Sequence, residues 1–121
     1  MNKNKIMDEL TENQIKTITK KINSNPSYKF LRESMEIIGN EERFSILNLL
    51  KKKPCLLSDI EQSMDRNQPT IAHHVRILKE HGFIHSSKKG KFKEYSISKK
   101  KFAELLKVWN KWFNVIRSKN Y

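Results

Sequence analysis

Residues 67–83, NQPTIAHHVRILKEHGF, carry more information about the fold than any other stretch of this chain. Apolar side chains recur at Ile71, Val75 and Leu78, which is the i, i+4 and i+7 spacing of one helical face. Most of the residues between them are histidine or arginine. The stretch therefore predicts an amphipathic helix over 67–81, with one face against a core and the other face exposed.

The ends and the exposed face of this helix have their own chemistry. Asn67 can cap the first turn, and Gly82 stands where a left-handed residue ends many helices. The face opposite the apolar stripe consists of Gln68, Pro69, Thr70, Ala72, His73, Arg76 and Lys79. Gln and Arg side chains can pair with the edges of adenine and guanine, so this face is a candidate for reading bases. A solvated helix face is the alternative interpretation.

The net charge points to a polyanionic partner. The 121 residues include 25 basic and 13 acidic side chains, for a net charge of +12. Segment 66–93 alone holds seven Lys and Arg residues against one acid, Glu80, and so carries half of that excess. This clustering favours a nucleic-acid-binding face over a charge that only keeps the protein in solution.

A basic hairpin follows the helix. Residues 83–97, FIHSSKKGKFKEYSI, have the alternation of two short strands with Gly90 at the tip. The lysines around that tip are Lys88, Lys89, Lys91 and Lys93. We expect this wing, residues 86–93, to contact the DNA backbone or minor groove and to supply affinity rather than sequence choice. A helix, short helix, turn, helix and basic hairpin form a winged helix-turn-helix, whose second helix lies in the major groove.

Capping residues locate the remaining helices. The expected N-caps are Thr11, Asn25, Asn40, Ser58 and Ser98. The helix after Asn40 is apolar on most sides, Phe44 included, and should be central. Residues 1–9 are expected to be loose, and residues 65–67 to form a tight turn. The fold class is therefore mainly α with a small β-hairpin wing (α+β), flanked by N- and C-terminal dimerisation helices.

Two apolar stripes outside the motif predict a subunit interface. On the first helix, Ile15, Ile18 and Ile22 share a face. On the last helix, the 3-4-3-4 spacing of helix pairing is followed by Phe102, Leu105, Trp109, Trp112 and Ile116, with Phe113 beside them. A chain of this size cannot easily bury both tryptophans in its own core, so we expect a homodimer. A last helix folded back on its own domain is the alternative.

The runs IIGNEERFSILNLL (37–50) and 67–97 resemble the ArsR-type family of bacterial and archaeal transcription regulators, over about residues 35–100. The matching positions are Ile38, Gly39, Asn40 and Arg43, then Gln68, His74, Val75, Leu78 and Gly82, then Gly90 and Tyr95. The resemblance implies a symmetric homodimer built from the terminal helices. It also implies binding to an inverted repeat, with repression relieved by an unidentified effector ligand or another signal.

These observations divide the chain into an N-terminal dimerisation arm (1–34), a DNA-binding domain (35–98) and a C-terminal dimerisation helix (99–121). The expected function is sequence-specific transcriptional regulation, most simply repression, by a homodimer on a palindromic operator in double-stranded DNA. One alternative is a winged-helix chromatin or protein-interaction module with little sequence preference. A ligand sensor with an apolar pocket between its terminal helices is a third possibility.

The sequence departs from the family pattern at the positions that bind metals. Cys55 stands alone in PCLLSDIE, and residues 98–121 contain no histidine and one acid, Glu104. His73 and His74 are adjacent and point about 100° apart on a helix, and no Cys or acid completes a tetrahedral set with them or with His81 and His85. No metal or cofactor is therefore expected. Ala72 stands where many family members have Ser, which removes one expected contact with DNA.

Several other classes of function are not expected. No Gly-rich phosphate loop, paired carboxylates or activated nucleophile points to an enzyme. Cys55 is either a redox switch or a buried, inert thiol, and the second is commoner for a lone cysteine between Pro and Leu. No apolar run is long enough to span a bilayer, and the first residues lack a signal-peptide core. We therefore expect a cytoplasmic, nucleoid-associated protein.

Overall fold

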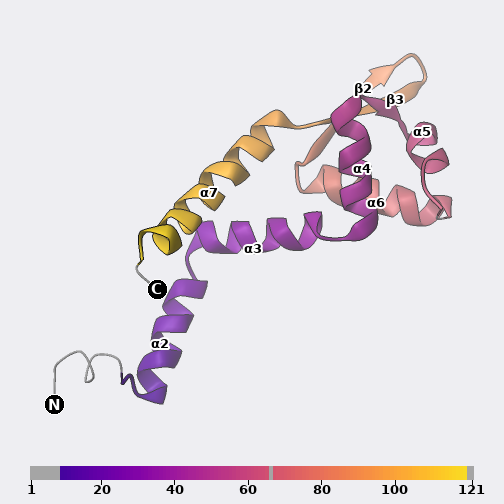
Figure 1. Cartoon of the computed structure of the whole chain (residues 1–121). Coiled ribbons are helices and arrows are strands. Elements are labelled where there is room, and N and C mark those ends of the chain that lie inside the picture. Colours follow the sequence, from indigo (N-terminus) through magenta and orange to yellow (C-terminus); the bar gives the residue numbers. More distant parts are fainter. Residues whose placement is uncertain (1–8, 66, 120–121) are drawn as a thin grey trace.

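The computed structural model describes residues 9–65 and 67–119, which form helices and a small antiparallel sheet at one end of the molecule (Figure 1). The helices are α2 (Glu12–Asn23), α3 (Pro26–Ile38), α4 (Glu41–Lys52), α5 (Leu57–Gln62), α6 (Gln68–Glu80) and α7 (Lys99–Ser118); the strands are β1 (Cys55–Leu56), β2 (Ile84–Lys89) and β3 (Phe92–Ile97). The predicted α+β class is confirmed. The expectations for the first eight residues, and for a turn through Arg66, fall on residues outside the described ranges.

Side-chain caps begin most helices where the sequence predicts them. Thr11 forms a capping box with Gln14, and Asn25 accepts from the backbone N–H of Ser27. In the same way Asn40 accepts from Arg43, Asn67 from Thr70 and Ser98 from Lys101, at 3.0 to 3.2 Å. Each cap satisfies a backbone donor that the helix itself leaves unpaired. The helix boundaries are therefore set locally.

The predicted cap at Ser58 is wrong. The N-cap position is Leu56, two residues earlier, so helix α5 begins at Leu57. The carboxylate of Asp59 accepts from the backbone N–H of Leu56 at 3.1 Å. The cause is strand β1, which the sequence analysis did not predict. Cys55 and Leu56 pair with Tyr95 and Glu94 of β3, so the chain enters α5 directly from a strand.

The sheet has the order β1-β3-β2, with β3 in the centre. Strands β2 and β3 form the predicted hairpin, in the register Ser86 opposite Tyr95, and Gly90 takes a positive φ of 63° at its tip. The hydrophobic core joins this sheet to α4, α5 and α6. Its buried members are Ile46, Leu47, Leu50, Cys55, Ile60, Ile71, Val75, Leu78, Phe83, Ile84 and Tyr95. Phe44, expected inside, is instead 52% exposed at the start of α4.

The remaining helices form an arm beside this core. Helices α3 and α7 run side by side, and α2 extends away from them (Figure 1). Helix α2 has no buried residue. Within the described residues, no helix is long and apolar enough to cross a membrane.

Candidate nucleic-acid interface

Helix α6 separates its apolar and polar side chains as the sequence predicts. Ile71, His74, Val75 and Leu78 are buried against the core. Of the candidate base-reading face, Gln68, Pro69, His73, Arg76 and Lys79 are exposed, whereas Thr70 and Ala72 are half-buried. The exposed members lie along one side of a rigid helix. This arrangement fits the convex edge of a recognition helix better than a loop-borne site.

Hydrogen bonds organise the polar face before any partner binds. The Nη2 of Arg76 lies 2.8 Å from the Nδ1 of His73. The Nε of Arg76 lies 4.0 Å from a carboxylate oxygen of Glu80. The hydroxyl of Thr70 donates to the Oδ1 of Asn67 at 2.7 Å. Thr70 is therefore engaged in the helix cap, and His73 with Arg76 forms the accessible centre of the face.

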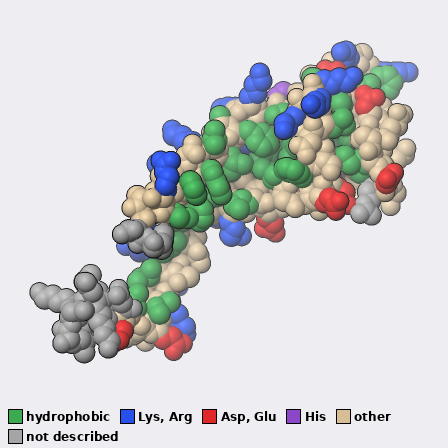
Figure 2. Space-filling model, in the orientation of Figure 1, with side chains coloured by type: hydrophobic (Ala, Val, Ile, Leu, Met, Phe, Trp, Pro, Cys, Tyr) green, Lys and Arg blue, Asp and Glu red, His purple; other side chains and the backbone are tan. Residues whose placement is uncertain are grey.

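The wing concentrates lysines in an arrangement that is unfavourable without a partner. Lys88 and Lys93 are directly opposite each other in the hairpin register, and like charges in such cross-strand pairs repel. Lys89 is partly neutralised by Glu94 at 3.2 Å, and Lys91 lies over the ring of Phe92. Figure 2 shows basic side chains gathered at the wing end of the molecule. An anion at this end would relieve the repulsion between Lys88 and Lys93.

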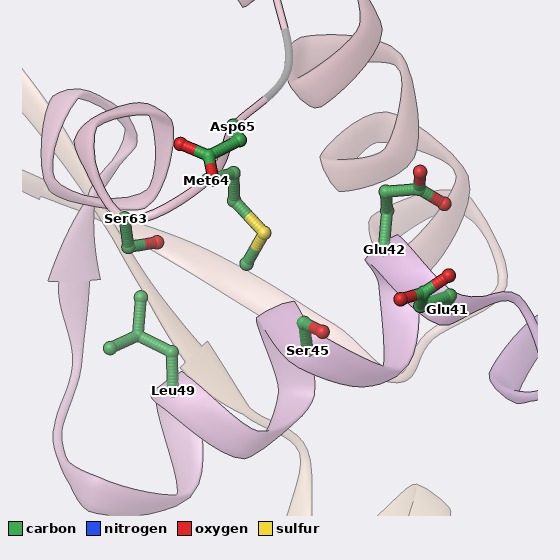
Figure 3. A pocket seen from close by; sticks show the side chains of 7 residues that line it. All are labelled: Glu41, Glu42, Ser45, Leu49, Ser63, Met64 and Asp65. Carbon is green, nitrogen blue, oxygen red and sulfur yellow. The ribbon is translucent and has the colours of Figure 1, made fainter.

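An acidic hollow lies between α4 and the residues that follow α5. A cavity of about 570 Å³ is lined by Glu41, Glu42, Ser45 and Leu49 of α4 and by Ser63, Met64 and Asp65 after α5. Figure 3 shows the carboxyl groups of Glu41 and Glu42 on one side of this hollow and that of Asp65 on the other.

Two buried side chains have shifted proton affinities. Burial, assisted by the Arg43 guanidinium, lowers the pKa of His74 below its ordinary range. Burial, assisted by the Asp59 carboxylate, raises the pKa of the Cys55 thiol. Neither environment gives a metal ligand set, and the described part of the chain contains no group of three or more His, Cys, Asp or Glu residues placed to hold a metal ion.

The predicted interface residues divide into two groups. Phe102 and Leu105 pack partly against the protein's own core, so the near end of α7 does fold back on its domain. Large apolar side chains stay exposed on both arms, namely Ile15, Ile18, Ile22, Met35, Leu106, Trp109, Trp112, Phe113 and Val115, while Ile116 is half-buried. Of these, Met35, Leu106 and Trp109 border an apolar groove of about 450 Å³ between α3, α4 and α7. A band of hydrophobic side chains is visible in Figure 2.

Two residues near the candidate DNA-binding surface were not predicted from the sequence to be functional. Phe92 is 54% exposed at the tip of the wing, and its place among the wing lysines could have identified it. Arg43 was matched only as a family position. Its guanidinium contacts the carbonyl of Ile37 and the ring of His74, which lies 31 residues further along the chain. No local pattern could have predicted that contact.

Comparison with known proteins places these features in a family. Residues 40–86 match the model of the bacterial regulatory proteins of the arsR family. An HTH-type transcriptional regulator of Methanocaldococcus jannaschii is 31% identical over 83 residues, which are 67% of this chain and 92% of that protein. The transcriptional repressor SdpR of Bacillus subtilis is 36% identical over 61 residues, which are 50% of this chain and 68% of that repressor.

Solved structures agree on the fold. The homodimeric winged helix-turn-helix DNA-binding domain Mb0332 of Mycobacterium bovis superposes with a TM-score of 0.55, covering 88% of this chain and 89% of that domain at 16% identity. The matched segment 40–86 contains the helix pair α4–α5, the polar face of α6 and the start of the wing. The chain therefore belongs to the ArsR family of winged helix-turn-helix transcriptional regulators, a family of DNA-binding regulators and not of enzymes.

Proposed function

We propose that this protein is a transcriptional repressor that binds a palindromic operator as a homodimer. The observation that carries the proposal is the pairing, in one domain, of a rigid helix with an exposed polar face and a lysine-rich wing. The similarity to a repressor of Bacillus subtilis favours repression over activation. In this proposal the protein works in the cytoplasm on the nucleoid, and an unidentified effector releases it from DNA.

The proposed contacts fall into two classes. Helix α6 enters the major groove, where Gln68, His73 and Arg76 read base edges and the rest of the exposed face contacts the backbone. In the wing, Lys88, Lys89, Lys91 and Lys93 neutralise phosphates or enter the minor groove. The first class sets the sequence preference, and the second sets affinity on any duplex.

The proposed dimer uses the arms that the single chain leaves uncovered. Residues 1–34 and 99–121 form the interface, and residues 35–98 form the DNA-binding unit. Support comes from the exposed isoleucines of α2 and the exposed aromatic side chains of α7, because exposed apolar patches on a soluble domain mark interaction sites. A two-fold axis would present two α6 helices to successive major grooves, about 34 Å apart.

A pair of variants tests the division of roles. Arg76→Ala is expected to lose about 1–3 kcal/mol of preference for the operator over a scrambled duplex, because it removes a side chain that reads bases. Lys91→Ala is the matched control. It should weaken both duplexes by the same factor and reduce the salt dependence by about 0.9 in the log–log slope. Fluorescence anisotropy at several salt concentrations measures both effects.

Two outcomes would contradict this assignment. If Arg76→Ala weakens operator and scrambled DNA equally, Arg76 holds phosphate and does not read bases. If the unmodified protein binds both duplexes alike, a chromatin-type module with little sequence preference replaces the repressor.

A further inference from the structure

Arg43 holds together three helices of the DNA-binding domain. Its Nε donates to the carbonyl oxygen of Ile37 in the last turn of α3 at 2.7 Å, and its Nη1 lies 3.1 Å from the Nδ1 of His74 in the middle of α6. The backbone N–H of Arg43 is fixed in turn by the cap residue Asn40. One side chain of α4 thus connects the arm to the helix that carries the candidate base-reading face.

The chemistry of this contact fixes the protonation state of His74. A guanidinium can only donate hydrogen bonds, so Nδ1 must accept, and the neutral ring then carries its proton on Nε2. The ring is 9% exposed, and burial lowers the pKa of His74. Arg43 and His73 lower that pKa further, whereas Glu42 opposes them. Protonation at Nδ1 would replace the acceptor by a donor pointing at a cation.

The position of His74 controls the direction of the candidate base-reading face. His73 precedes it directly, with its ring centroid 5.8 Å from that of His74, and Arg76 bonds to His73. Because an α-helix is rigid over one turn, the rotation of α6 that keeps His74 on Arg43 also sets where His73 and Arg76 point. Without the contact between Arg43 and His74, α6 can rotate against the core. The other side chains on the buried face of α6 are apolar, and apolar contacts do not fix a direction.

We infer that Arg43 is a positioning residue for DNA recognition, acting through neutral His74 to hold α6 at the rotation in which His73 and Arg76 face the operator. The inference rests on the proposed function of α6. It has a consequence for pH: acid breaks the contact and releases operator DNA.

The contact itself is tested without DNA. Nitrogen–proton correlation spectra of the histidine rings should show His74 as the Nε2–H tautomer, titrating below the ordinary histidine value of about 6.5. In Arg43→Met the pKa of His74 should move upwards, whereas the matched control Arg32→Met, an exposed arginine of α3, should leave it unchanged. An Nδ1–H tautomer, or an unchanged titration in Arg43→Met, overturns the inference.

The effect on recognition is tested with a duplex selected from a random pool and its scrambled counterpart. As the pH falls from about 8 through the pKa of His74, which burial lowers below its ordinary value, the preference for the selected duplex at constant ionic strength should fall. The loss should reach about tenfold once His74 is fully protonated, since a positioned hydrogen bond to a charged group is then lost. His74→Asn places an acceptor where Nδ1 lies and does not titrate. The His74→Asn variant should prefer the selected duplex at high pH and keep that preference in acid. The Arg43→Met variant should show no such preference at any pH.

Two results would contradict the positioning role of Arg43. One is the same acid loss in His74→Asn as in the unmodified protein, and the other is an undiminished preference in Arg43→Met. If the unmodified protein shows no preference even at about pH 8, the proposed function fails and the positioning role with it, while the ring spectra still report whether the contact exists.

Circular dichroism at each pH separates release from unfolding. The unfolded chain takes up a proton at His74 near its ordinary pKa of about 6.5, whereas the folded chain does so only at lower pH. The unfolded state therefore binds more protons in this window, and the free energy of unfolding falls as the pH drops below about 6.5. His74→Asn lacks this dependence, and preference is compared only where both proteins remain folded.

Discussion

Burial changes the proton affinity of individual side chains in this domain relative to the same side chains in water. Cys55 is 3% exposed, its Sγ lies 3.4 Å from the carbonyl oxygen of Lys53, and its backbone pairs with Tyr95 in the sheet. Burial and the nearby Asp59 carboxylate raise the pKa of its thiol, so the reactive thiolate is scarce at neutral pH. Of the two interpretations of this cysteine, the inert one fits the structure.

This environment predicts slow modification of Cys55. Ellman's reagent at about pH 8 should label the native protein far more slowly than the urea-unfolded chain, because the thiol is both buried and protonated. Labelling reports on this residue alone, since the chain has one cysteine. Glutathione serves as the control for reagent activity. Native labelling as fast as that of the unfolded chain would restore the redox-switch interpretation.

Residues whose roles depend on helical periodicity were accessible from the sequence. The 3.6-residue repeat correctly put Ile71, Val75 and Leu78 on the core side of α6 and His73 on the exposed side. The partner of His74 was not accessible. Arg43 reaches it across two packed helices, and periodicity carries no information about which side chains meet in three dimensions.

At the scale of elements, the end of α6 depends on one glycine. Gly82 has φ of +78°, and the backbone N–H groups of Gly82 and Phe83 close the last turn on Lys79 and Leu78. A side chain at Gly82 would have ordinary contact with Lys101, so space is not the constraint. The constraint is the left-handed backbone, which disfavours residues with a Cβ.

Gly82→Ala is therefore expected to lower the free energy of unfolding by about 1–2 kcal/mol. Gly82→Asn is the matched control, since Asn tolerates this conformation better and should lose less. Urea denaturation followed by tryptophan fluorescence measures both variants. Equal losses for Ala and Asn would show that crowding, and not backbone conformation, sets the cost.

Local chemistry explains which elements could be predicted. The caps at Asn40, Asn67 and Ser98 act within three residues, and the hairpin is set by alternation and by Gly90. Strand β1 has only two residues, too few for a period, and exists because β3 offers a free edge. The start of α5 was misplaced for the same reason, because a tertiary pairing decides where that helix begins.

At the scale of the whole molecule, the described chain is apolar where a partner copy is proposed and basic where DNA is proposed. The exposed aromatic side chains belong to α7, and the groove of about 450 Å³ lies between α3, α4 and α7. The length of the chain and the 3-4-3-4 stripe predicted an interface there. Neither feature could predict that Phe102 and Leu105 pack against the hydrophobic core of their own chain, because that packing depends on how α7 docks on α3.

Selection of duplexes from a random-sequence pool by the purified protein tests the central claim most directly. A homodimer that presents two α6 helices should enrich an inverted repeat whose half-site centres are about one helical turn, or roughly 10 base pairs, apart. Enrichment of a single unrepeated half-site would contradict the two-fold arrangement. A pool that shows no enrichment, despite salt-dependent binding, would contradict sequence-specific recognition itself.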